Sequence, residues 1–176
     1  LQIKDVFYHQ AGFQRGDKEV KTANGKQSYG WGIRVINNLK DATITDLTIS
    51  NNNITNVAHT GIKFTSKYQN IQDIRVTHNI VTETGGPGIQ LSGVRNGYFA
   101  HNLVNYSGSH NDSRKWGRGS GLWTWGSDNI LIEHNEFSNA RGPGDSAGVH
   151  IDYNCSHVVV QYNLSTNNAG GFCEIL

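Results

Sequence analysis

Two acidic residues near the end of the chain have the type and spacing for acid–base chemistry. The segment GVHIDY (148–153) returns, slightly varied, as GGFCEI (170–175). If the two segments are neighbouring parallel strands, Asp152 and Glu174 lie one above the other, about 4.8 Å apart. Retaining glycosidases hold two carboxyl groups about 5–5.5 Å apart to break a glycosidic bond. The two acids are therefore a candidate catalytic pair, and stacked acids titrate as a coupled unit.

His150 lies two residues before Asp152, and therefore on the same face of the expected strand. A histidine there can hydrogen-bond a sugar hydroxyl or tune the two acids. Two other interpretations of the acids stay open. They form half of a Ca²⁺ site, because hard cations take oxygen ligands, or they are a surface pair without function. We expect no cofactor and assign no metal ligand, with Ca²⁺ as the one ion that the acids suggest.

Short repeated strands must position these residues. One type begins at or near a glycine and alternates apolar with variable residues, which predicts a strand with one buried face. Its copies lie at residues 32–36, 61–65, 88–92, 121–125, 148–152 and 170–174. A second type alternates with it, at residues 47–54, 74–81, 98–104, 130–137 and 158–165. Repetition with a period of about 20–50 residues is typical of solenoids.

Each strand of the second type carries an asparagine after its apolar residues. These are Asn52, Asn79, Asn102, Asn135 and Asn163. Asparagines that recur at a bend can hydrogen-bond to the copies above and below, which forms a ladder. His78, His101 and His134 each precede a ladder asparagine, so we expect them to stack outside the bend; a metal role is the alternative. An antiparallel sandwich would instead need two-residue hairpin turns.

With these two repeats in phase, residues 30–176 resemble the right-handed parallel β-helix of the pectate-lyase-like superfold. The resemblance implies an all-β solenoid of about six coils with an inward asparagine ladder, after an irregular segment or first partial coil at 1–29. β-Helical glycoside hydrolases look similar in placing acids on neighbouring coils. By that resemblance Asp152 is the nucleophile or base and Glu174 is the acid/base. It also implies a poly- or oligosaccharide substrate and an extracellular or periplasmic location.

The alternation of each strand places two columns of side chains on its outer face. One column is predicted to run Arg34, Lys63, Gln90, Trp123, His150, Phe172, and the other Ile36, Thr65, Ser92, Trp125, Asp152, Glu174. Tryptophan is suited to stacking on sugar rings. We therefore predict that the substrate-binding residues are Arg34, Lys63, Gln90, Trp123, Trp125 and, from a long loop, Trp116. The loop at 140–147 can bring Asp145 or Arg141 to the same place.

Composition limits the other classes of function. The 15 Lys and Arg nearly balance the 14 Asp and Glu, and no basic run is present, so we expect no nucleic-acid partner. No segment has the length and apolarity of a membrane span or the pattern of a signal peptide, so we expect no membrane partner. In the predicted register Cys173 points inward and Cys155 lies far from it along the chain. We therefore expect two free thiols.

Three functions stay open. The three-aspartate pattern of polygalacturonases and the calcium-and-arginine set of pectate lyases are not found, so the acid pair and the tryptophans favour a glycoside hydrolase. The alternatives are a polysaccharide lyase acting on an anionic sugar polymer and a non-catalytic carbohydrate-binding β-helix. The sequence stops directly after the Glu174 strand, where a solenoid end exposes unpaired backbone. We expect further coils or another chain to cover that end, as part of a longer helix.

Overall fold

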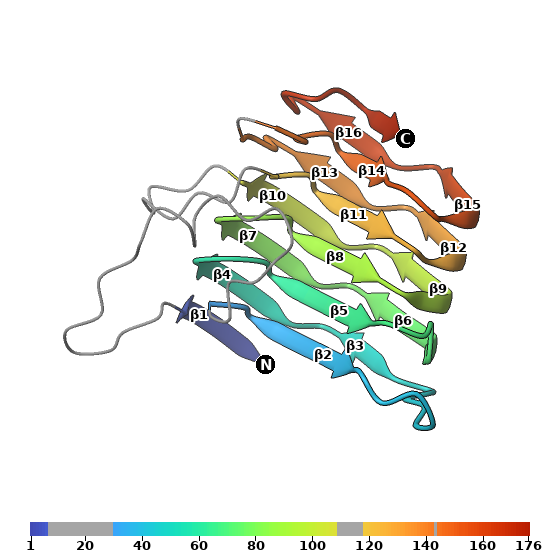
Figure 1. Ribbon diagram of the computed structural model, residues 1–176. Coiled ribbons are helices and arrows are strands. Elements are labelled where there is room, and N and C mark those ends of the chain that lie inside the picture. The colour runs from blue at the N-terminus through green and yellow to red at the C-terminus, as the bar shows by residue number, and fades with distance from the viewer. Residues whose placement is uncertain (7–29, 109–117, 143) are drawn as a thin grey trace.

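The computed structural model describes residues 1–6, 30–108, 118–142 and 144–176. Within these ranges the regular elements are all strands, and the chain winds through three parallel sheets, coil upon coil, from the N-terminus to the C-terminus (Figure 1). The predicted all-β parallel β-helix is confirmed. None of the described residues lies in a helix long and apolar enough to cross a membrane.

Each coil contributes one strand to each sheet, except the last, which has strands in sheets A and B only. Sheet A contains β1 (Gln2–Val6), β4 (Asn53–Val57), β7 (Ile80–Thr84), β10 (Leu103–Ser107), β13 (Glu136–Ser138) and β16 (Leu164–Thr166). Sheet B contains β2 (Ile33–Asn37), β5 (Ile62–Ser66), β8 (Ile89–Ser92), β11 (Leu122–Trp125), β14 (Val149–Ile151) and β17 (Cys173–Ile175). Sheet C contains β3 (Thr48–Ser50), β6 (Ile71–Thr77), β9 (Val94–Ala100), β12 (Asp128–Glu133) and β15 (Ser156–Gln161). The glycine-led repeats thus form sheet B.

The inward residues of the three sheets meet in one apolar core. Ile62, Phe64, Ile89 and Leu91 on sheet B are fully buried, as their alternation with polar neighbours predicts. The Phe64 ring meets Phe99 of sheet C edge-on, with the centroids 6.2 Å apart. Contacts of this kind tie the sheets together because hydrophobic burial is the main stabilising term of such a core.

The asparagine ladder forms at the bend between sheets C and A. The Asn79 side chain donates a hydrogen bond to Asn102 Oδ1 over 3.0 Å, and the Asn102 side chain donates to Asn135 Oδ1 over 2.9 Å. Asn52 and Asn163 extend the ladder at its two ends. Each residue just before a ladder asparagine has a positive φ, and the rings of His78, His101 and His134 stack 4.9 and 5.2 Å apart. Both predictions for this bend are confirmed.

A column of glycines precedes the strands of sheet B. Gly32, Gly61, Gly88, Gly121 and Gly148 occupy equivalent places, as the register of the following residues shows. A Cβ on Gly121 would lie 2.6 Å from Gly148 O and 2.6 Å from Phe137 Cδ1. Successive coils and sheet A therefore approach so closely at this column that a side chain does not fit.

The last coil departs from the predicted register. Val149 pairs with Cys173 and His150 pairs with Glu174. Phe172, and not Gly170, therefore occupies the place above Gly148 in the glycine column. The prediction that Asp152 and Glu174 stack was therefore wrong. The reason is that Gly170 and Gly171 belong to a turn before the strand. Gly171 has a φ of +86° and donates its N–H to Asn168 O. The shift is by two residues, which keeps Cys173 inward and Glu174 outward.

Both cysteines are free thiols, as expected. Cys173 packs against the core, and burial, followed by the charge of Glu174, raises the pKa of its thiol. Coverage of β17 by further coils or another chain stays a prediction.

Candidate active site

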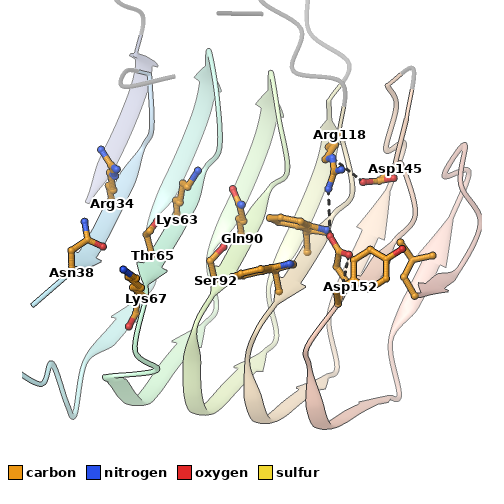
Figure 2. Close-up of a pocket in the computed structure, with 15 residues that line it drawn as sticks. Arg34, Asn38, Lys63, Thr65, Lys67, Gln90, Ser92, Arg118, Asp145 and Asp152 are labelled. Carbon is orange, nitrogen blue, oxygen red and sulfur yellow. Dashed lines mark hydrogen bonds and ion pairs between the residues drawn. The ribbon is translucent and has the colours of Figure 1, made fainter. Parts of the chain in front are cut away.

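A cleft of about 740 Å³ runs along the outer face of sheet B. Its lining residues come from strands β2, β5, β8 and β11, from the residues that directly follow β2, β5, β14 and β17, and from the loops before β11 and β14 (Figure 2). They are Arg34, Asn38, Lys63, Thr65, Ser66, Lys67, Gln90, Ser92, Arg118, Trp123, Trp125, Asp145, Asp152, Tyr153 and Leu176. Arg34, Lys63 and Lys67 lie over the early coils, and both acids lie over the late coils together with Arg118. The cleft is therefore polarised along the solenoid axis.

The strand register builds the two predicted columns up to the last coil. Arg34, Lys63, Gln90, Trp123 and His150 are successive partners in sheet B. Ile36, Thr65, Ser92 and Trp125 form the second column, and Asp152 joins it by donating its N–H to Thr124 O. The structure thus brings the predicted binding residues of this sheet to one face. Trp116 lies outside the described residues.

The outer face of sheet B is much more buried than a solvated sheet face. Trp123 is 6% exposed, His150 0% and Asp152 3%. Lys63 and Gln90 are also buried. Trp125 differs because 41% of its surface stays accessible at the cleft. Burying polar side chains costs free energy unless they have partners. Buried polar side chains on the outer face of a sheet are therefore typical of a functional site and not of a solvated surface.

Arg118 joins two carboxylates at the acidic end of the cleft. Its Nε lies 3.3 Å from Asp145 Oδ2 and its Nη1 lies 3.4 Å from Asp152 Oδ2 (Figure 2). Asp152 also accepts a hydrogen bond of 2.7 Å from the Tyr153 N–H. The guanidinium carbon of Arg118 lies 5.6 Å from the centroid of the Trp123 ring. The arginine therefore fixes both acids relative to the tryptophan.

Asp145 and Glu174 flank His150. The Nδ1 atom of His150 lies 3.6 Å from Asp145 Oδ2 and 3.7 Å from Glu174 Oε2. The His150 ring also meets the Trp123 ring in an edge-to-face contact, with the centroids 6.3 Å apart. Asp145, His150 and Glu174 each offer a ligand atom within 4.8 Å of the others, so they are the described residues best placed to hold a metal ion.

Asp145 and Arg118 complete the site, and both come from loops. Asp145 or Arg141 was expected to reach the cleft from the loop at 140–147, and Asp145 does so. The Arg141 guanidinium instead donates to Ala140 O and Asn167 O. Arg118 comes from the same long loop as Trp116, but it was not assigned a role. Its segment has no counterpart in the other coils, so the repeat carries no signal for its position.

The opposite end of the cleft is cationic. The Arg34 guanidinium lies 4.0 Å and the Lys63 ammonium 5.7 Å from the centroid of the Trp31 ring. Burial, and then the charge of Arg34, lower the pKa of Lys63 to about 8. Burial also lowers the pKa of Arg34. Cations held side by side in this way favour a neighbouring anion.

The sequence matches one family. The model described as "Right handed beta helix region" matches residues 31–175, and the chain belongs to this family. A search of curated protein sequences found no significant match.

Among solved structures, the chain is similar to the crystal structure of the GH136 lacto-N-biosidase from Eubacterium ramulus, in its native form. The TM-score is 0.59 and the sequence identity 17%. The match covers 80% of this chain and 25% of the lacto-N-biosidase, so this chain corresponds to about a quarter of that protein. At this identity the similarity shows the fold alone.

Proposed function

We propose that the cleft on sheet B hydrolyses a glycosidic bond of a poly- or oligosaccharide. One observation carries the proposal: Asp145 and Asp152 line the same cleft as Trp123 and Trp125, and one guanidinium contacts both acids. Glycosidases need one carboxylate to attack the sugar or activate water and one carboxylic acid to protonate the leaving oxygen. Two acids at one end of an aromatic cleft supply these two groups.

Asp152 is the candidate nucleophile or base. It is buried on a rigid strand end, and the Tyr153 N–H and Arg118 both donate to its oxygens. These donors orient the carboxylate and stabilise its negative charge. A group that must attack one carbon atom benefits from such fixed geometry.

Asp145 is the better-placed second acid because it lines the same cleft and its side chain is 21% exposed. Glu174, the acid expected from the sequence, is the alternative. It lies on the far coil beside His150, outside the residues that line the cleft, with a side chain 35% exposed. In either case the acid lies beside His150, whose Nδ1 is 3.6 Å from Asp145 Oδ2 and 3.7 Å from Glu174 Oε2.

Sugar binding rests on Trp125, whose exposed ring faces the cleft, and on the amide and hydroxyl groups of Gln90, Ser92 and Thr65. Flat aromatic faces beside a few polar groups are typical of carbohydrate sites. The protein of similar fold is a lacto-N-biosidase, a glycoside hydrolase, which supports this class of chemistry. An extracellular or periplasmic location, where such substrates occur, is part of the proposal.

The test is a matched set of isosteric variants, Asp152→Asn, Asp145→Asn and Glu174→Gln. Each is assayed on a panel of neutral and acidic oligosaccharides by detecting the reducing ends released. We expect Asp152→Asn and one of the other two to lower kcat/KM by about 10²-fold or more, and the remaining one to have a small effect. An NMR measurement of the anomer first released distinguishes retention from inversion. Full activity in Asp152→Asn would refute the proposed role of this cleft.

A lyase is the second candidate function, and Lys63 is the observation that favours it. A lysine with a pKa of about 8 can act as a base at neutral pH, and Arg34 beside it can bind an acidic sugar. Elimination leaves a double bond in the product, which absorbs ultraviolet light. An increase in absorbance during cleavage of an acidic polysaccharide, lost in Lys63→Met and kept in Asp152→Asn, would favour the lyase.

A further inference from the structure

We propose that Asp145, His150 and Glu174 form a binding site for a divalent transition-metal ion such as Zn²⁺. The three residues come from the loop before β14, from β14 and from β17, and all three ligand atoms lie within 4.8 Å of one another. The proposal departs from the expectation of no metal ligand. It does not depend on the proposed hydrolysis, because metal binding is measured without any sugar.

Two of the three distances between the ligand atoms are close to those around a tetrahedral ion, and the two carboxylate oxygens, which lie within 4.8 Å of each other, would draw together on binding. When each metal–ligand bond is about 2.1 Å, tetrahedral ligand atoms lie about 3.4 Å apart. Nδ1 of His150 lies 3.6 Å from Asp145 Oδ2 and 3.7 Å from Glu174 Oε2. Three protein ligands also leave a fourth position for water, as in catalytic zinc sites.

His150 provides the independent observation that points to a ligand. Its side chain is completely buried, yet neither ring nitrogen forms a hydrogen bond with any residue that the structure describes. A buried imidazole without a hydrogen bond is costly, and a metal ion bound at Nδ1 would satisfy it. An imidazole ligand also favours Zn²⁺ and related ions over Ca²⁺, which takes oxygen ligands.

The charges of the cluster favour a cation. Asp145, Asp152 and Glu174 bring three carboxylates to this end of the cleft. Arg118 is the one Lys or Arg that ion-pairs with them in the described part of the chain. A divalent ion would balance the charge that Arg118 leaves. Oδ2 of Asp145 faces both His150 Nδ1 and Arg118 Nε, and a carboxylate oxygen has two lone pairs, so this oxygen can bind the ion and keep its contact with Arg118.

The ion would also fasten the last coil to the coil below it. It would connect β17 to β14 and to the loop that carries Asp145, in addition to the backbone hydrogen bonds of the sheet. Binding to the folded state alone stabilises a protein by mass action. In the proposed hydrolysis a bound ion would occupy the second acid, so it would inhibit the reaction.

The test is titration of the EDTA-treated, tag-free protein with ZnCl₂ by calorimetry, together with thermal unfolding with and without the metal. We expect one saturable site and a higher unfolding temperature with Zn²⁺. His150→Gln and Glu174→Gln should each weaken binding by about tenfold or more. Glu174 is partly exposed, so its variant tests the site even if His150→Gln fails to fold.

His101→Asn is the matched control. It removes an exposed histidine from the stacked column, and asparagine tolerates the positive φ at that position. We expect its affinity for Zn²⁺ to equal that of the wild type. The absence of a saturable site, or equal weakening in His101→Asn, would overturn the proposal. If EDTA treatment abolished sugar cleavage, the metal site would survive and the metal-free hydrolysis would not.

Discussion

Glu174 lies beside His150, and not beside Asp152, in sheet B. Its carboxylate is 3.7 Å from His150 Nδ1, while the acid that shares the cleft with Asp152 is Asp145 from a loop. This relationship divides the acidic end into two overlapping groups. Arg118 connects Asp145 to Asp152, and His150 connects Asp145 to Glu174. Asp145 belongs to both, so its substitution should affect both sugar cleavage and metal binding.

The exposed tryptophan is predicted to contribute to substrate binding more than to stability. Trp125→Ala removes a ring that is 41% exposed at the cleft, and we expect KM to rise about 2- to 10-fold with little change in kcat. The measurement is steady-state kinetics on the best oligosaccharide found. Tyr68→Ala, which removes an aromatic side chain of similar exposure that does not line the cleft, is the control. A change confined to kcat would contradict a binding role.

The middle of the asparagine ladder is predicted to be critical for stability. Asn102→Ala deletes the acceptor of Asn79 and leaves buried groups such as Val76 O without their donor. Each buried polar group left unsatisfied costs about 1–3 kcal/mol, so we expect a loss of at least about 2 kcal/mol. Urea denaturation followed by circular dichroism measures it. Asn52→Ala, at the more exposed end of the ladder, should cost less; an equal cost would show that burial does not set the effect.

The glycine column is predicted to tolerate no side chain. In Gly121→Ala the new methyl group would lie 2.6 Å from Gly148 O and from Phe137, so the coils must move apart. Overpacking of this kind costs about 1–3 kcal/mol, which a lower denaturation midpoint would show. Gly126→Asn is the control: its φ of +56° suits asparagine and no atom lies within 4 Å of a Cβ there. If both variants were equally stable, close packing at the column would be wrong.

Lys63 is predicted to make stability depend on pH. Burial and Arg34 lower its pKa from 10.5 to about 8 in the folded protein, so between these values the unfolded chain binds more protons. Stability therefore rises with pH across that range, and the cost of burying the charge is largest below pH 8. We expect Lys63→Met to stabilise the protein more at pH 7 than at pH 10, by urea denaturation.

The exposed Lys40 gives the control, since Lys40→Met should change stability little at either pH. If Lys63→Met destabilised the protein equally at both values, the buried charge would not be the cause of the pH dependence.

The fold was predictable because every coil repeats the same sequence pattern. Period-two alternation set the faces of sheet B, and recurring asparagines set the bend, so the columns from Arg34 to His150 were predicted correctly. The last coil was not, because Gly170 and Gly171 resemble the glycines of the column yet belong to a turn. Arg118 and Asp145 come from loops, where no repeated neighbour fixes the register. The positions of these two loop residues could therefore be obtained only from the structure.

The parallel register makes the cleft a molecular ruler. Arg34 and Asp152 are four coils apart, and each step between parallel strands is about 4.8 Å, so the two ends of the cleft are separated by about 19 Å along the axis. Backbone hydrogen bonds between neighbouring strands fix this step. A ligand that reaches both ends must have a matching length. To accept a longer one, the protein would have to gain a whole coil.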